Sequence, residues 1–222
     1  MPNSRPALVS IVTPSFNQGR YIERTVRSVL CQAYPAIEYL VMDGKSGDET
    51  ATILDKYHAS GMRLVCERDA GQADALHRGF SLVDGEILAW LNADDVYAGP
   101  NVVANAVAYF ARHPEVDVLF GRRVVMDVDG RFRGLWPRIG FEAGMLRRVD
   151  FIPQECCFWR RSLWERAGGY VHRGYEFAMD YELWLRFMVV GARFAGVNQV
   201  FGLCSEHAAQ KTQAGWDVTG WA

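Results

Sequence analysis

The sequence lacks any apolar run long enough to cross a membrane. Near its start, the longest such run is residues 7–12. That is too short for the core of a signal peptide and far from the roughly 20 residues of a membrane span. We therefore expect a cytoplasmic protein. Peripheral association with the inner face of a membrane, through the aromatic-rich C-terminal tail, stays open.

Strong net charge and paired cysteine motifs are also absent. There are 24 Lys and Arg against 26 Asp and Glu, a formal net charge of −2. Such a chain has no global field that draws it to nucleic acid, so we expect no nucleic-acid partner and only local phosphate recognition. The five cysteines show no CxxC or Cys/His ligand spacing. This is typical of reduced thiols in the cytoplasm.

The first half of the chain alternates between buried strands and amphipathic helices. Continuous apolar runs predict strands at residues 8–13, 37–42, 63–67 and 86–91. Apolar residues at helical spacing, or a polar start signal, predict helices at residues 21–30, 49–59 and 72–82. Strands that alternate with helices in this way imply crossover connections and a mostly parallel sheet. The predicted fold class is thus α/β.

The second half is less regular. Helices are predicted at residues 101–112, 161–167 and 177–190, and strands at 116–125 and 156–159, with a glycine-interrupted connecting region at 127–150. A length of 222 residues, 50% of them hydrophobic, suits one main domain. We divide it into residues 1–126 and a smaller region, 127–222.

Polar loops follow the first four predicted strands. They are residues 14–18, Asp43, residues 67–69 and residues 92–95. In an open parallel sheet, ligands bind beyond the carboxyl ends of the strands. Any one acidic loop is explained by ordinary surface polarity. Carboxylates after three successive strands instead indicate a common crevice.

Asp94 and Asp95 end a buried run and are the sharpest signal in the sequence. Carboxylate oxygens bind Mg²⁺ or Mn²⁺, and a site with one or two of them leaves positions for water and substrate phosphates. We expect Asp94 to bind a divalent metal. For Asp95, metal binding and capping of the following turn both remain open.

Five segments resemble the family 2 glycosyltransferases of the GT-A fold, and they occur in the family's order over most of the chain. They are Val9–Asn17, Asp43-Gly44, Gly71–Leu76, Leu91–Asp95 and Asp180–Trp184. The resemblance implies a Rossmann-like GT-A sheet. Its first half, residues 1–126, would bind a nucleotide diphosphate sugar. The second half would bind the acceptor, a glycan or a lipid-linked group, and supply the catalytic base.

The resemblance also implies roles for individual residues. Asp180 would be the general base, Asp94 the metal ligand of a DxD-like motif, and His207 a C-terminal residue that closes on the metal or diphosphate. The nucleoside base and ribose would contact Pro14, Phe16 and Asp43. Further substrate-binding positions are Asn17, Asp69, Gln72, Asp74, Asn92 and Gln154.

Two positions depart from the family pattern. Asn92 stands where members often have the first carboxylate of the metal motif, although an amide can still bond to the ribose or to a coordinated water. Lys45 replaces a small residue and is expected to face solvent rather than a phosphate. Asp74 can serve either the start of its helix or the ligand.

The chemistry of glycosyl transfer accounts for these residue types. Breaking an anomeric C–O bond releases a diphosphate, which a divalent cation stabilises, and the attacking hydroxyl needs a base. One base with direct attack predicts inversion, with a UDP-sugar as the default donor. For Trp159 and Trp164 we expect the core rather than sugar stacking.

Two other functions remain as alternatives. A nucleotidyltransferase would open with a Gly-rich, basic loop after the first strand, which residues 13–19 do not form. A catalytically inactive sugar-nucleotide-binding relative is suggested by Asn92 and Lys45. Retention of Asp43, Asp94 and Asp180 argues against it.

Overall fold

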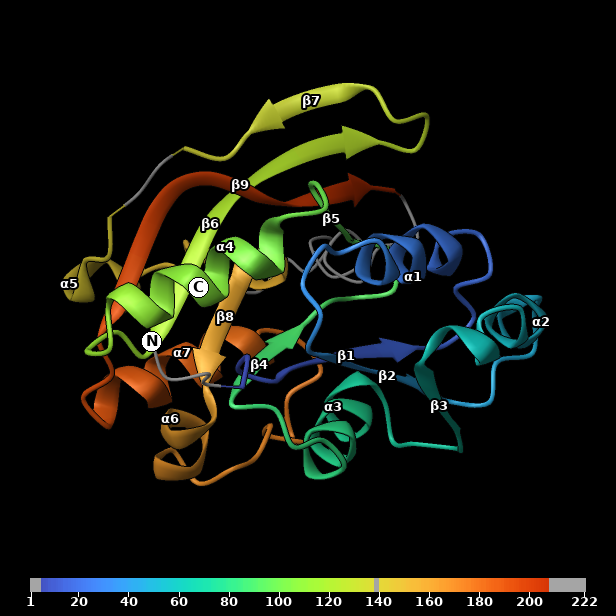
Figure 1. The fold of residues 1–222 in the computed structure, drawn as a ribbon, viewed down its shortest axis with the longest axis horizontal. Helices are drawn as coiled ribbons and strands as arrows, with labels where there is room; N and C mark the ends of the chain where they lie inside the picture. The colour runs from blue at the N-terminus through green and yellow to red at the C-terminus, as the bar shows by residue number, and fades with distance from the viewer. Residues whose placement is uncertain (1–4, 138–139, 208–222) are drawn as a thin grey trace, which may run out of the picture.

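The computed structural model describes residues 5–137 and 140–207. These residues form a sheet with helices on both faces (Figure 1). Nine strands of the described residues lie in the order β3-β2-β1-β4-β8-β6-β9-β5, with β7 paired to β6. The parallel pairs β1–β2, β2–β3, β1–β4 and β6–β9 make up most of the register. The predicted α/β class and mostly parallel sheet are confirmed.

The first half contains the four predicted parallel strands. They are β1 (Val9–Ser15), β2 (Ile37–Asp43), β3 (Met62–Cys66) and β4 (Ile87–Trp90). The helices between them are α1 (Ile22–Leu30), α2 (Thr50–Asp55) and α3 (Gln72–Ser81). Helix α2 is shorter than predicted. A 3-10 turn, η1 (His58–Ser60), follows it and ends at Gly61 with a left-handed φ of 84°.

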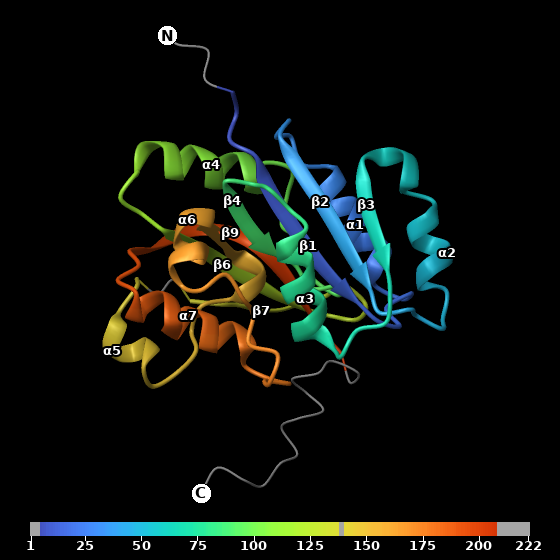
Figure 2. The ribbon, with the colours of Figure 1, turned by 90° about the horizontal axis from the view of Figure 1, so that it is seen from below.

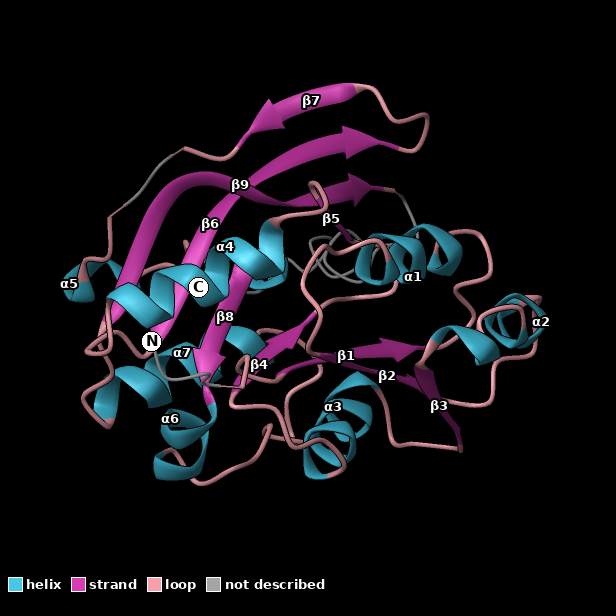
Figure 3. Cartoon of the chain, in the orientation of Figure 1, coloured by secondary structure: helices cyan, strands magenta, loops and turns pink. Residues whose placement is uncertain are grey.

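The remaining strands extend the same sheet. They are β5 (Val96–Tyr97), β6 (Val118–Asp127), β7 (Phe132–Leu135), β8 (Cys157–Arg160) and β9 (Phe194–Glu206). Strand β8 lies antiparallel between β4 and β6, so β6 runs in the direction of β4. Figure 3 shows β6, β7 and β9 curling away from β1 and β2.

The remaining helical elements surround these strands. They are α4 (Val102–Arg112), α5 (Ala143–Leu146), η2 (Gln154–Cys156), α6 (Arg161–Arg166) and α7 (Met179–Val189). Strand β7 and helix α5 lie in residues 127–150, which the sequence predicts only as a connection. Strand β9 is not predicted at all.

Two apolar layers cover the two faces of the sheet. On one face Val12 packs with residues of α3, α6 and α7, and on the other Ile11 packs with residues of α1 and α4. Successive side chains of a strand point to opposite faces, which is why neighbours in β1 belong to different layers. Figure 2 shows α3 in front of the strands and α1 behind them, on the opposite face.

Trp159 and Trp164 belong to the first of these layers. Trp159 is fully buried and Trp164 is 4% exposed. Both therefore pack in the core, as expected, and neither presents a face for sugar stacking.

Within the described residues, no helix is long and apolar enough to cross a membrane. The aromatic-rich tail on which the predicted membrane association depends lies in residues 208–222, outside the described residues.

Candidate active site

The carboxyl ends of β1, β2, β3 and β4 meet at one edge of the sheet, because these neighbouring strands are parallel. Ser15 pairs in register with Asp43, and Asp43 pairs with Cys66, so the first three strands end level. The loops that follow carry most of the predicted site residues. This edge is the candidate site.

The loop after β1 is hydrogen-bonded to the loop after β2. The Asn17 N–H donates to Ser46 Oγ (2.8 Å), and the Gly47 N–H donates to Asn17 Oδ1 (2.8 Å). Asn17 and Lys45 have φ values of 53° and 62°. Residues with side chains adopt this left-handed conformation rarely, and such strain clusters at functional sites. Lys45 itself is exposed, in keeping with the solvent-facing expectation.

Asp43 lies beneath these two loops and is only 1% exposed. Its Oδ2 accepts from the Ser46 N–H (2.9 Å) and its Oδ1 from the Ser46 hydroxyl (2.6 Å). The carboxylate therefore fixes the loop after β2. Its predicted contact with the base or ribose remains a prediction.

Phe16 and Asp69 both lie close to Gly44. A Cβ added to Gly44 would stand 2.9 Å from Asp69 Oδ2 and 3.2 Å from Phe16 Cδ2, so only glycine fits here without a shift. Phe16 is 59% exposed and offers a flat apolar face at this edge. Pro14, by contrast, is buried within β1 opposite Met42.

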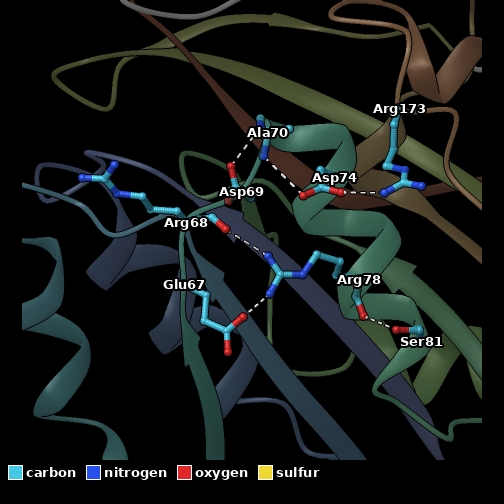
Figure 4. A network of polar contacts seen from close by, with 9 residues as sticks. Glu67, Arg68, Asp69, Ala70, Asp74, Arg78, Ser81 and Arg173 are labelled. Carbon is cyan, nitrogen blue, oxygen red and sulfur yellow. Dashed lines mark hydrogen bonds and ion pairs between the residues drawn. The ribbon is translucent and has the colours of Figure 1, made fainter.

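A polar network holds the start of α3 (Figure 4). Asp69 Oδ1 accepts from the Gly71 N–H (2.9 Å), while Asp74 accepts from the Ala70 N–H and from Arg173 (both 3.2 Å). Burial opposes ionisation of Asp74, but the Ala70 N–H and the Arg173 guanidinium outweigh it and lower the pKa of Asp74. These contacts suit the helix-start role of Asp74. A contact with the ligand remains a prediction.

Asn92 joins several predicted site residues. Its side chain is hydrogen-bonded to Gln72 (2.8 Å), Gln154 (3.0 Å) and Asp95 (3.2 Å). Gln154 is buried and also donates to the Trp90 carbonyl. Residues from α3, η2 and the loop after β4 thus meet at one amide.

Asp94 and His207 lie side by side although 113 residues separate them. His207 Nε2 is 3.0 Å from Asp94 Oδ2. The imidazole also stacks on Tyr21, with ring centroids 4.3 Å apart. The structure therefore brings together two of the three predicted metal ligands.

Asp95 is the third predicted ligand and is 3% exposed. Its Oδ2 accepts from the Asn92 side chain, and its Oδ1 has no hydrogen-bond partner among the described residues. Burial, with further contributions from Asp94 and Glu155, raises the pKa of Asp95 well above its usual range. A buried acceptor without a partner is costly unless a cation or proton satisfies it.

The chemistry of these side chains fits a divalent metal only in part. Asp94 and His207 supply an oxygen and a nitrogen ligand within reach of each other, and Asp95 Oδ1 lacks a partner in the described part of the chain. Across the described residues, no three His, Cys, Asp or Glu side chains are grouped closely enough to hold an ion by themselves. Mg²⁺ and Mn²⁺ sites at diphosphates often use one or two protein carboxylates and take other ligands from substrate and water.

Acidic side chains gather around Arg123, on the side where the sequence predicts the acceptor. Glu155, 3% exposed, has its Oε1 3.3 Å from Arg123 Nε. Asp180, half-buried in the first turn of α7, accepts from the Tyr181 N–H (3.0 Å). Burial is the largest cause that raises the pKa of Asp180. Ala178, which precedes this helix, has a left-handed φ of 54°.

Asp150 belongs to the same acidic group. Burial and the charge of Asp180 raise its pKa to about 7. Sequence reasoning passes over Asp150, Arg123 and Arg173. Asp150 and Arg173 lie in irregular segments, and Arg123 follows the buried part of β6, so none has a spacing that marks it. A charged residue in a half-buried strand is the one available signal, at Arg123.

These features define the class of protein. An α/β sheet with acidic residues at its carboxyl edge, and a histidine returning from the last strand, is the arrangement of a GT-A glycosyltransferase. The chain belongs to glycosyl transferase family 2, whose family model matches residues 10–165.

Curated relatives agree with this family. An uncharacterized glycosyltransferase of Mycobacterium tuberculosis strain H37Rv is 34% identical over 189 residues, covering 82% of this chain and 69% of the relative. A PGL/p-HBAD biosynthesis glycosyltransferase of Mycobacterium bovis is 28% identical over 182 residues, covering 81% and 69%.

Solved structures share the fold. Residues 1–349 of TarS from S. aureus, in complex with UDP-GlcNAc, align with a TM-score of 0.76 at 17% identity, covering 91% of this chain and 60% of that one. The mannosyltransferase PcManGT of Pyrobaculum calidifontis, in complex with GDP-Man and Mn²⁺, aligns with a TM-score of 0.71 at 22% identity, covering 97% and 61%.

Proposed function

We propose that this glycosyltransferase is inverting and metal-dependent, and that it moves a sugar from a nucleoside diphosphate donor to a hydroxyl of a glycan or lipid-linked acceptor. A UDP-sugar is the default donor. The observation that carries the proposal is the pairing of Asp94 with His207, 3.0 Å apart, at the edge where β1 to β4 end. Complexes of TarS with UDP-GlcNAc and of PcManGT with GDP-Man and Mn²⁺ support a nucleotide-sugar donor.

On the donor side, the nucleoside would lie over the loops after β1 and β2. Phe16 is exposed enough to stack on a base, and Asp69 lies close to the same glycine, Gly44. Asp43 and Asn17 would shape this pocket through their bonds to Ser46, and Asp43 would accept from the base or ribose. Pro14 would support the loop from within β1.

At the diphosphate, Asp94 and His207 would hold a divalent metal, with Asp95 as a further ligand. Bound there, such an ion stabilises the negative charge of the leaving diphosphate. Tyr21 keeps the imidazole in place through the ring stack. The N-terminus of α3, where Gln72 lies, would attract the diphosphate because a helix N-terminus carries partial positive charge.

On the acceptor side, Asp180 would accept the proton of the attacking hydroxyl. Burial raises the pKa of Asp180, which makes its carboxylate a stronger base. Gln154 would orient the acceptor. Because the hydroxyl attacks directly, with one base and no covalent intermediate, the anomeric configuration inverts. We place this reaction at the cytoplasmic face, where a lipid-linked acceptor would require contact with the membrane.

Product analysis tests the proposal. With Mn²⁺ and UDP-glucose, UDP-GlcNAc or GDP-mannose, slow donor hydrolysis should release the nucleoside diphosphate, and EDTA should stop it. Release of nucleoside monophosphate, or synthesis of nucleotide sugar from a triphosphate, would point to a nucleotidyltransferase. Tight nucleotide binding without any turnover would point to an inactive relative.

A further inference from the structure

The Asn92 side chain uses its full hydrogen-bonding capacity within the protein. Its Oδ1 accepts from Trp90 Nε1 (2.7 Å) and Gln72 Nε2 (2.8 Å). Its Nδ2 donates to Gln154 Oε1 (3.0 Å) and Asp95 Oδ2 (3.2 Å). An amide has two N–H donors and one carbonyl oxygen with two lone pairs, so all four places are taken.

The orientation of this amide is fixed by its neighbours. An indole N–H can only donate, so the atom that faces Trp90 Nε1 is the Asn92 oxygen. The amide nitrogen therefore points to Gln154 and Asp95. A carboxylate side chain, such as that of Asp95, can only accept when ionised, which agrees with this assignment.

We propose that Asn92 is a positioning residue that holds Asp95, Gln154 and Gln72 in register, and that it does not contact the donor ribose. This inference rests on the proposed function, because those three residues belong to its metal, acceptor and donor sides. It replaces the direct ribose contact that the sequence suggests for this position. The amide at the first position of the DxD-like motif therefore matches its hydrogen-bonding partners, and a carboxylate there would match them less well.

An aspartate at position 92 would fit the space but not the bonds. It would still accept from Trp90 and Gln72, yet it would set an ionised oxygen against Asp95 Oδ2 and Gln154 Oε1, where the structure has N–H donors at 3.2 and 3.0 Å. Asp95 already lies near Asp94 and Glu155, and its Oδ1 has no partner in the described part of the chain. A further carboxylate would add repulsion at this point.

A stability cycle without ligand tests these bonds. Asn92→Asp should lower the unfolding temperature by several degrees, since the variant loses both donated bonds. In the Asp95→Asn background the same substitution should cost less than half as much, because the amide introduced by that background change could then donate to the new carboxylate. An unfolding temperature within about 1 °C of the wild type, or an equal loss in both backgrounds, would overturn the proposal.

A second cycle separates positioning from ribose contact. Calorimetry with Mn²⁺ would compare UDP or GDP with its 2′-deoxy and 3′-deoxy forms, in the wild type and in Asn92→Ala. For each deoxy form, the quantity compared is its dissociation constant divided by that of the parent nucleotide. If Asn92 only positions other residues, this ratio should differ by less than twofold between the wild type and Asn92→Ala. A ratio that falls toward one, by about tenfold, would reveal a ribose contact and overturn the proposal.

The two cycles fail in different ways. A wild type that binds neither UDP nor GDP would contradict the proposed function. The ligand-free stability cycle would still decide whether the amide of Asn92 holds Asp95.

Discussion

Among single residues, the acidic side chains on the proposed acceptor side differ in how well cations neutralise them. Both carboxylate oxygens of Glu182 accept from Arg186 at 2.9 Å, and Glu155 pairs with Arg123. Asp180 accepts from the Tyr181 N–H, and in the described part of the chain no cationic side chain forms an ion pair with it. A base needs an oxygen that can receive a proton, so Asp180 is the best suited of the three.

Replacing the proposed base, Asp180, separates its effect on turnover from its effect on nucleotide binding. Asp180→Asn keeps the size of the side chain but cannot take the acceptor proton, so turnover should fall by roughly 10²–10⁴. The dissociation constant of the nucleotide with Mn²⁺ should stay within about twofold. Steady-state kinetics and calorimetry measure the two effects, with Glu182→Gln as a control outside the proposed site. Near-normal turnover in Asp180→Asn would transfer the role to Glu155.

The acidic group around Asp150 makes a prediction about pH. Burial and the nearby Asp180 raise the pKa of Asp150 to about 7, with a further contribution from Glu155, while the Ile152 N–H and Arg123 act in the other direction. In the unfolded chain an aspartate titrates near 3.9. Between these values the folded state binds more protons, so this group lowers the free energy of unfolding as pH rises from about 4 to 7.

Asp150→Asn removes that penalty. The variant should unfold a few degrees higher than the wild type at pH 8 and show no such gain at pH 4.5, as followed by circular dichroism. Tyr181 is a further titratable neighbour, and because burial and Asp150 raise its pKa above the ordinary value near 10, it stays neutral over this range. A gain that is the same at both pH values would mean that Asp150 carries no such charge penalty.

That several predicted residues lie at one edge of the sheet follows from the sequence for a physical reason. Asp94 and Asp43 end unbroken apolar strands, and parallel strands bring their carboxyl ends together. His207 comes from the family resemblance, and the structure places it beside Asp94. Arg123 and Asp150 are not predictable from the sequence, because the charged side chains near them, Glu155 and Asp180, come close only in the folded chain.

Among the elements, the strands buried on both faces are predictable from sequence and the irregular ones are not. Residues 8–13 form an apolar run, and β1 is buried throughout. In β9, by contrast, buried and exposed residues do not alternate, and Gly196 and Gly202 interrupt the pattern. Much of its pairing is with β6, far away in the sequence. A strand that is stabilised by such distant contacts has no local sequence pattern that predicts it.

Helix α3 depends on one glycine for its close approach to the sheet. A Cβ added to Gly79 would lie 2.6 Å from Val12 Cγ1 and 3.0 Å from Met42 Cγ. Gly79→Val should therefore lower the free energy of unfolding by about 1–3 kcal/mol, through overpacking. Urea denaturation measures this loss. The matched control is Gly134→Val on β7, where an added Cβ meets nothing within 4 Å.

Equal stability of these two valine variants would show that α3 can move away from β1 at little cost. That result would also weaken the account of the site, because Gln72 at the start of α3 is bonded to Asn92.

In the whole molecule, one sheet runs through both predicted halves. Strand β8, from the second half, lies between β4 and β6 of the first. Asp94 comes from the first half, while His207 and Asp180 come from the second. The division at residue 126 stays a prediction about roles, since a site of this kind needs residues from both sides.

Ligand-dependent unfolding tests the central claim, that this edge binds a nucleoside diphosphate with a metal. A nucleotide at ~100 times its dissociation constant adds about 2.7 kcal/mol of stability, which for a chain of this size is roughly 5–10 °C. We predict this shift for one of UDP, GDP or dTDP with Mn²⁺ in the wild type. Asp94→Ala should unfold at the wild-type temperature without ligand and lose most of the shift. No stabilisation of the wild type by any of the three, or an equal shift in Asp94→Ala, would contradict the account.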